Sequence, residues 1–145
     1  MSCPVQEHYR QAPGIYTRLK VDTSRHQAKL EVALECLAYA GHLTLCATGL
    51  SMMPRIRPGS RVRIRRAHAG ELTPGDVILA RTAEGIRLHR LVSVGAQNSQ
   101  PVWITRGDNH PHCDPPLVRE QILGVMTHVQ KPALLQRALR RLRIA

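Results

Sequence analysis

A serine on a predicted rigid turn is one of the residues in this sequence that could take part in a chemical reaction. Ser51 lies two residues after Gly49 and just past an apolar run, and Pro54 follows it in the segment GLSMMPRIRPGS. A serine presented at the end of a strand on such a turn is well placed to act as a nucleophile. Serine beside glycine and proline is also a frequent turn former, so the segment by itself leaves both interpretations open.

A histidine and two carboxylates are the candidates for proton transfer. His89 lies in the apolar segment RLHRLVSV, where a strand would point it to one face of a sheet. Neutral imidazole can accept a proton near neutral pH, although a histidine in an apolar strand can equally be a core residue. Asp108 and Asp114 lie further along in the segment TRGDNHPHCD, which its glycine, asparagine and proline mark as a turn.

The turn segment also contains side chains that ligate metals. His110, His112 and Cys113 accompany the aspartates there, and Pro111 favours an extended backbone that would place the two histidines on one side. No second group of ligands follows with the spacing of a structural zinc site. We therefore expect a polar loop, with no bound metal and no cofactor.

The elements that position these candidates are predicted to be mainly β. Short apolar, β-branched runs separated by proline and glycine are typical of strands. One of them, RVRIRR from Arg61, alternates basic and apolar residues, which predicts a positively charged, solvent-facing side. The predicted strands lie at residues 43–47, 62–64, 77–79, 86–94, 102–105 and 122–129.

The domain organisation follows from the segments on either side of these strands. Residues 1–25 are polar and irregular and predict an N-terminal arm, and residues 26–131 predict one β-domain with a leading helix at 27–40 that ends at Gly41. Residues 132–145 predict a short basic amphipathic helix, which either packs on its own sheet or lies on an anionic membrane or acidic partner. The apolar face of the leading helix is predicted to consist of Leu30, Ala33, Leu34, Leu37 and Ala38.

The amino-acid composition limits which cellular compartments and binding partners are expected for this protein. Lys plus Arg number 21 against 10 for Asp plus Glu, and the formal net charge of +11 predicts attraction to an acidic partner. Phe is absent, which disfavours a protein that binds single-stranded nucleic acid by stacking bases on aromatic side chains. The four cysteines are scattered, and we expect neither a signal peptide nor a transmembrane segment. These features predict a soluble, cytoplasmic protein, with a peripheral membrane location as the alternative.

Taken in chain order, the motifs resemble the type I signal peptidase family, which shares its β-fold and serine chemistry with the LexA-like repressors. The resemblance covers about residues 46–129 and implies a signal-peptidase/LexA-like β-fold with an N-terminal amphipathic helix and a short C-terminal helix. The motifs are S-M-x-P at Ser51, G-D at Gly75, H-R at His89, G-D-N at Gly107 and I-L-G-V at Ile122.

The resemblance implies a role for each matching residue. Ser51 matches the nucleophile, and His89 falls where most bacterial members have a lysine base and the eukaryotic, archaeal and sporulation-type signal peptidases have a histidine. Asp108 and Asp114 match acidic positions beside the site. An imidazole base usually needs an acceptor on its second nitrogen, and we expect Asp114 in that role, with Asp108 as the competing candidate. Substrate contacts are predicted at Gly49, Met52, Met53 and Pro54.

The chain also departs from the family pattern. Gly49 stands where many bacterial relatives have a hydroxyl residue that helps to bind the oxyanion. The Ser51 backbone N–H is expected to be one hydrogen-bond donor to the oxyanion, and the sequence does not identify the second donor. Arg55 stands where the family usually has threonine. The transmembrane anchor of members that process secretory signals is missing, which resembles the short, soluble bacterial members.

The leading prediction is a soluble serine endopeptidase that cuts a specific peptide or protein by a Ser-His(-Asp) mechanism and binds it as an added β-strand. The alternative is a non-catalytic regulatory or nucleic-acid- or peptide-binding module on the same fold. Only one helix is predicted before the sheet, so a helix-turn-helix pair is not available and nucleic acid is disfavoured as a partner.

Overall fold

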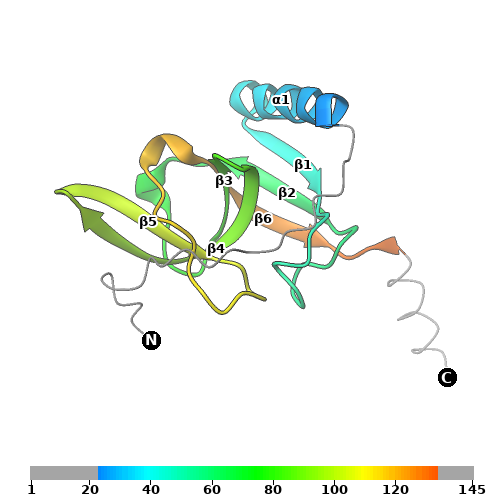
Figure 1. The fold of residues 1–145 in the computed structure, drawn as a ribbon. Helices are drawn as coiled ribbons and strands as arrows, with labels where there is room; N and C mark the ends of the chain where they lie inside the picture. Colours follow the sequence, from blue (N-terminus) through cyan, green and yellow to red (C-terminus); the bar gives the residue numbers. More distant parts are fainter. Residues whose placement is uncertain (1–22, 134–145) are drawn as a thin grey trace.

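The computed structural model describes residues 23–133, which form one helix and a six-stranded antiparallel sheet (Figure 1). The prediction of a mainly β domain with a leading helix is confirmed. The predicted arm up to residue 22 and residues 134–145 of the predicted C-terminal helix lie outside the described residues. The elements are α1 (Thr23–Ala40), β1 (His42–Cys46), β2 (Arg61–Arg66), β3 (Val77–Thr82), β4 (Gly85–Gln97), β5 (Gln100–Arg106) and β6 (Ile122–Gln130), with 3-10 turns η1 (Ala69–Glu71) and η2 (Arg119–Gln121).

The sheet has the strand order β1-β2-β6-β3-β4-β5 and coils strongly along its length (Figure 1). Strand β4 is shared between two partners: its first part pairs with β3, and from Arg90 onward it pairs with β5. The stretch from Gly85 to His89 therefore has a strand neighbour on one side only. This division of β4 leaves an unpaired edge beside His89.

Each predicted strand is present, but β4 continues beyond its predicted end. Gly95 was expected to break the strand, whereas it lies inside β4 opposite Val102. The hairpin turns later, where Asn98 and Ser99 adopt positive φ angles of 50° and 62°. Asparagine tolerates this left-handed conformation better than most residues, so the turn forms there and the glycine remains extended.

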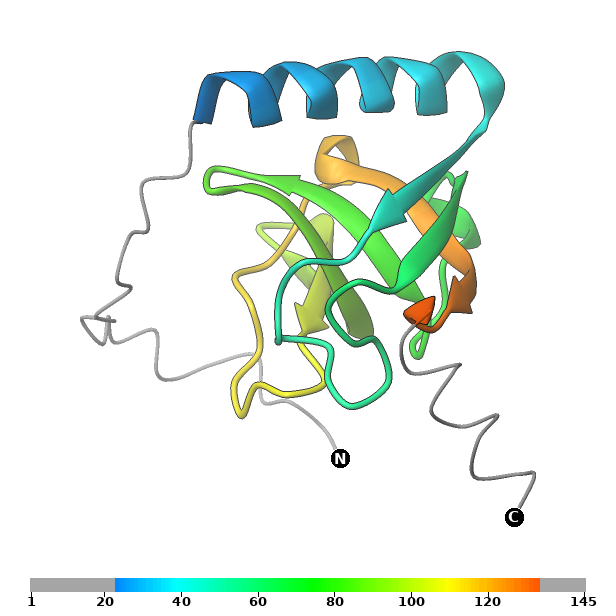
Figure 2. The same cartoon turned by 90° about the vertical axis from the view of Figure 1, so that its right-hand side faces the viewer.

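Helix α1 lies across one end of the coiled sheet (Figure 2) and packs on β1 and β2. It begins at Thr23, four residues before the predicted start. Leu34 and Leu37 are buried as predicted, whereas Ala38 is exposed, contrary to prediction. The predicted stop is confirmed: Gly41 has a φ of 80°, and its N–H donates to the Leu37 carbonyl at 2.9 Å.

The core beneath α1 also holds the segment that follows β1. Val62 and Ile64 of β2 are fully buried, while the intervening arginines are exposed, which confirms the predicted alternation of RVRIRR. Met52 and Ile56, on either side of the Met53–Pro54 cis peptide, pack into the same apolar cluster. The turn that carries Ser51 is thus anchored by buried side chains. Among residues 23–133, no helix is long and apolar enough to cross a bilayer.

Replacing Leu37 by alanine is expected to lower the free energy of unfolding by about 2–5 kcal/mol, because the change leaves a cavity beneath α1. Val32→Ala is the matched control on the same helix, where the side chain is 60% exposed, and should change the free energy by less than about 0.5 kcal/mol. Denaturant unfolding followed by circular dichroism measures both variants. Equal losses in the two would contradict the packing of α1 on the sheet.

Candidate active site

Ser51 lies on a short turned segment that connects β1 to β2. The base of the segment is closed by two backbone hydrogen bonds, from Ala47 N–H to the Ser60 carbonyl at 2.8 Å and from Gly59 N–H to the Ala47 carbonyl at 2.7 Å. Within it, Ile56 N–H donates to the Met52 carbonyl at 2.9 Å. With Met52 and Ile56 buried, the partly exposed Ser51 is fixed on this turn, after the end of β1 at Cys46.

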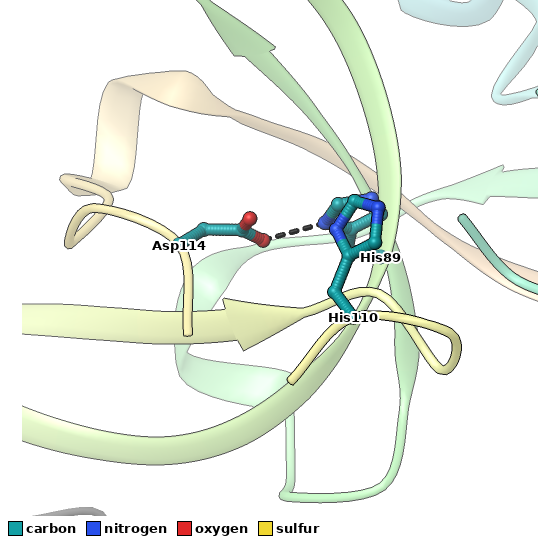
Figure 3. A group of neighbouring side chains, drawn as sticks. All are labelled: His89, His110 and Asp114. Atoms are coloured by element: carbon teal, nitrogen blue, oxygen red, sulfur yellow. Dashed lines mark hydrogen bonds and ion pairs between the residues drawn. The ribbon is translucent and has the colours of Figure 1, made fainter. Parts of the chain in front are cut away.

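His89 and Asp114 form a partly buried hydrogen-bonded pair (Figure 3). His89 is only 5% exposed on β4, and its Nδ1 lies 2.5 Å from Asp114 Oδ2. Asp114 is itself anchored to β5, because Thr105 Oγ1 donates to the same carboxylate oxygen at 2.7 Å and Asp114 N–H donates to the Thr105 carbonyl at 2.7 Å. Arg87 Nη1 lies 3.6 Å from the other oxygen, Oδ1.

These contacts keep Asp114 ionised. Burial by itself raises the pKa of Asp114, but the hydrogen bonds from His89 and Thr105 outweigh it and hold the pKa below its usual value. A carboxylate only accepts hydrogen bonds, so His89 Nδ1 is the donor. The Nε2 atom of a neutral His89 is then the acceptor nitrogen, which is the tautomer that a general base needs.

Asp108 has a different partner. Both of its carboxylate oxygens accept hydrogen bonds from the Arg90 guanidinium at 2.8 Å, and Arg90 also donates to the Gly75 carbonyl at 2.7 Å. The hydrogen bond from Arg90 lowers the pKa of Asp108 despite partial burial, and the nearby charges of Arg55 and Arg106 add to that effect. Of the two candidate carboxylates, Asp114 is therefore the one that contacts His89, whereas Asp108 contacts Arg90, which lies on the same strand as His89.

The segment after β5 also holds the backbone of the serine turn. Asn109 N–H donates to the Ser51 carbonyl at 2.8 Å, and Asn109 Nδ2 donates to the Leu50 carbonyl at 3.3 Å. Gly107 is buried so close to this turn that a Cβ atom there would lie 2.7 Å from the Ser51 carbonyl oxygen. Sequence reasoning missed these positioning roles of Gly107 and Asn109, although the G-D-N motif marked the segment.

A cavity of about 680 Å³ is lined by Ser51, His89 and His110 together with mostly apolar neighbours from β1, β3 and β4. Two of the predicted substrate-contacting residues, Gly49 and Met52, line it, and Met53 and Pro54 are not among its lining residues. Within residues 23–133, the Ser51 hydroxyl makes no hydrogen bond to His89. The serine and the histidine thus line one cavity without a hydrogen bond between them.

His110 is the site residue whose role the sequence did not predict. Its ring packs edge-to-face on His89, with ring centroids 5.4 Å apart and an interplanar angle of 89°. One ligand atom each from His89, His110 and Asp114 lies within 4.8 Å of the others, so these three residues could hold a metal ion. His112 is not part of this cluster, because the second imidazole comes from β4.

In comparisons with known proteins, the chain matches no protein-family model and no curated protein sequence.

Asp108→Asn is expected to make the fold less sensitive to acid. The folded-state pKa of Asp108 lies below its ordinary value, so the unfolded chain binds more protons and stability rises with pH. This contribution is present above the unfolded-state pKa of about 3.9 and is lost as the pH falls through the lower folded-state value. The slope of unfolding free energy against pH should therefore be shallower below about pH 5 in Asp108→Asn than in wild type.

The charge-matched control for this experiment is Glu84→Gln. Glu84 pairs with Arg87 across a distance of 3.0 Å, but its side chain is 84% exposed, so the solvent screens the pair. We expect the slope to change less in this variant than in Asp108→Asn. Identical slopes in wild type and Asp108→Asn would contradict a stabilising Asp108–Arg90 ion pair.

Proposed function

We propose that the chain is a serine endopeptidase of the signal-peptidase type, with Ser51 as nucleophile, His89 as general base and Asp114 as the group that orients His89. The observation that carries the proposal is the partly buried Asp114–His89 hydrogen bond at the wall of the cavity that Ser51 also lines. A serine hydroxyl is a weak nucleophile until a base takes its proton, and an oriented imidazole is the usual base. The finer proposal for the fold is the signal-peptidase/LexA-like arrangement of this open sheet.

The proposed reaction proceeds in two halves. Ser51 Oγ attacks the carbonyl carbon of the scissile peptide bond while its proton passes to His89 Nε2, and His89 then gives that proton to the departing amine. Water, deprotonated by His89, hydrolyses the resulting acyl-serine and restores the enzyme. Asp114 stays ionised throughout and stabilises the imidazolium that forms in each half.

The negative oxygen of the intermediate needs hydrogen-bond donors. Among residues 23–133 the Ser51 backbone N–H donates to no protein acceptor, so it is available for this oxyanion. The family pattern does not identify the second donor, because this chain has Gly49 where many relatives have a hydroxyl residue. Thr48 lines the cavity beside it and is our candidate for that donor.

The strand edges around the cavity support binding of substrate as an added strand. Strand β1 is at one end of the strand order, and the stretch of β4 before Arg90 has no strand partner on the side away from β3. Both strands contribute residues to the lining of the cavity. An extended peptide placed there gains main-chain hydrogen bonds, and its side chains meet the apolar wall. We propose that such binding also brings Ser51 and His89 into contact, because catalytic hydrogen bonds often tighten only in the substrate complex.

The charge of the sheet favours an acidic or membrane-proximal substrate. Arg61 and Arg63 are exposed on β2, and neither forms an ion pair within the part of the chain that the structure describes. A basic face of this kind attracts acidic peptides and anionic surfaces by long-range electrostatics. The exposed thiols of Cys36 and Cys46 favour a reducing compartment, and we propose a cytoplasmic location.

A serine-directed probe tests the nucleophile without knowledge of the substrate. Incubation with a fluorophosphonate, and separately with a β-lactam-type probe, should give a single adduct on Ser51 by mass spectrometry, because His89 activates only that hydroxyl. The adduct should be absent from Ser51→Ala and present in Ser93→Ala, a matched serine variant on the strand that carries His89. Folded wild-type protein that acquires no adduct with either probe between about pH 6 and 9 would overturn the proposal.

The two aspartates make a further test of the same mechanism. Asp114→Asn should slow labelling of Ser51 by about 10²–10⁴, because it removes the acceptor that selects the reactive tautomer of His89. Asp108→Asn leaves the Asp114–His89 bond in place and should cost much less. The wild-type labelling rate should also fall on acidification, since a protonated imidazole cannot accept the serine proton. Equal rates in the two asparagine variants would remove Asp114 from its proposed role.

A further inference from the structure

We propose that His89, His110 and Asp114 form a binding site for a zinc-like divalent ion, and that this ion reversibly inhibits the site. The inhibitory part rests on the proposed function, whereas the binding itself does not. The basis is the juxtaposition of two imidazoles and one carboxylate whose ligand atoms lie within 4.8 Å of one another, from two different segments of the chain.

The donor set selects the class of metal. Two imidazole nitrogens and one carboxylate oxygen are the ligands of zinc sites that leave a fourth position open, whereas Mg²⁺ and Ca²⁺ prefer sets made of oxygen atoms. The site therefore fits Zn²⁺ or Co²⁺ better than Mg²⁺.

The site is accessible and only partly prepared. His110 is exposed and lines the same cavity as His89, so an ion can enter through that opening without unfolding β4. Distances of up to 4.8 Å exceed those between ligands around one zinc ion, so His110 must move slightly toward the ion. Arg87 lies 3.6 Å from Asp114 and opposes a second positive charge. These features describe a reversible site and not a permanent structural one.

Inhibition follows from the electronic structure of imidazole. A neutral imidazole has one nitrogen with a free lone pair and one that carries a proton. An ion that also binds Asp114 takes His89 Nδ1, the ring nitrogen that lies 2.5 Å from Asp114 Oδ2. The imidazole proton then moves from Nδ1 to Nε2, so Nε2 has no free lone pair to accept the Ser51 proton. The serine therefore stays protonated and unreactive.

The binding test uses the untagged full chain with Ser51→Ala, so that the result does not depend on serine chemistry. Titration with Co²⁺ should produce the visible absorption of a four-coordinate ion with one equivalent bound, and Zn²⁺ should displace it. His110→Ala in this background should weaken Co²⁺ binding about tenfold or more. The matched control is His112→Ala, an exposed histidine of the same segment outside the cluster, which should bind as the parent does.

Two outcomes of the titration would overturn the site. One is a Co²⁺ affinity that is the same in His110→Ala as in its parent. The other is an ultraviolet thiolate band, which would place the ion on a cysteine such as the exposed Cys36 or Cys46. Addition of Mg²⁺ at the same concentration is expected to leave Co²⁺ binding unchanged.

The inhibition test follows fluorophosphonate labelling of wild-type Ser51 with and without Zn²⁺. Saturating Zn²⁺ should slow labelling at least tenfold, a chelator should restore it, and His110→Ala should shift the inhibition to higher Zn²⁺ concentration. Co²⁺ binding with unchanged labelling would overturn the inhibitory role. If Ser51 is not labelled under any condition, the proposed function fails, and the Co²⁺ titration still decides whether the metal site exists.

Discussion

The close approach of Gly107 to the Ser51 carbonyl oxygen is the contact on which the geometry of the site depends. A single added Cβ atom would lie 2.7 Å from that oxygen, so only glycine lets the chain after β5 pass against the serine turn. Once the two segments touch, Asn109 can bond to the Ser51 carbonyl, and the next residues carry His110 and Asp114 toward β4. This backbone contact thus sets where Asp114 and Ser51 lie relative to each other.

The coiling of the sheet brings the serine turn and His89 to the same cavity. Ser51 follows β1 and His89 lies on β4, and these strands are separated by three others in the sheet order. They face a common cavity only because the sheet curls, and the core under α1 fixes that curl through Val62, Ile64 and the buried Met52. The apolar cluster therefore supports the site indirectly, since its packing holds the serine turn against the sheet that carries His89.

Local sequence patterns predicted the elements better than the contacts between them. The alternation in RVRIRR and the spacing of proline and glycine located all the strands, and Gly41 located the end of α1. The patterns failed where contacts between distant parts of the chain determine the local structure. Gly95 is held in β4 by pairing with Val102. Ala38 is exposed because α1 packs on the sheet along a narrower stripe than its periodicity predicted. The partner of His110 is on a strand distant in sequence, so spacing within its own turn could not reveal it.

The choice between the two aspartates shows how environment assigns roles to identical side chains. Asp108 meets the fork of Arg90, and a bidentate pair uses both of its oxygens in one plane. This ion pair holds the segment after β5 to β4, so the Asp108 carboxylate is not available to an imidazole. Asp114 receives single bonds from a histidine and a threonine on one oxygen and has only a distant arginine near the other. Because Arg87 does not form such a bidentate pair, the Asp114 carboxylate remains available to accept a hydrogen bond from His89. The arginine positions, more than the aspartates themselves, decide which carboxylate holds the segment after β5 to β4 and which one pairs with His89.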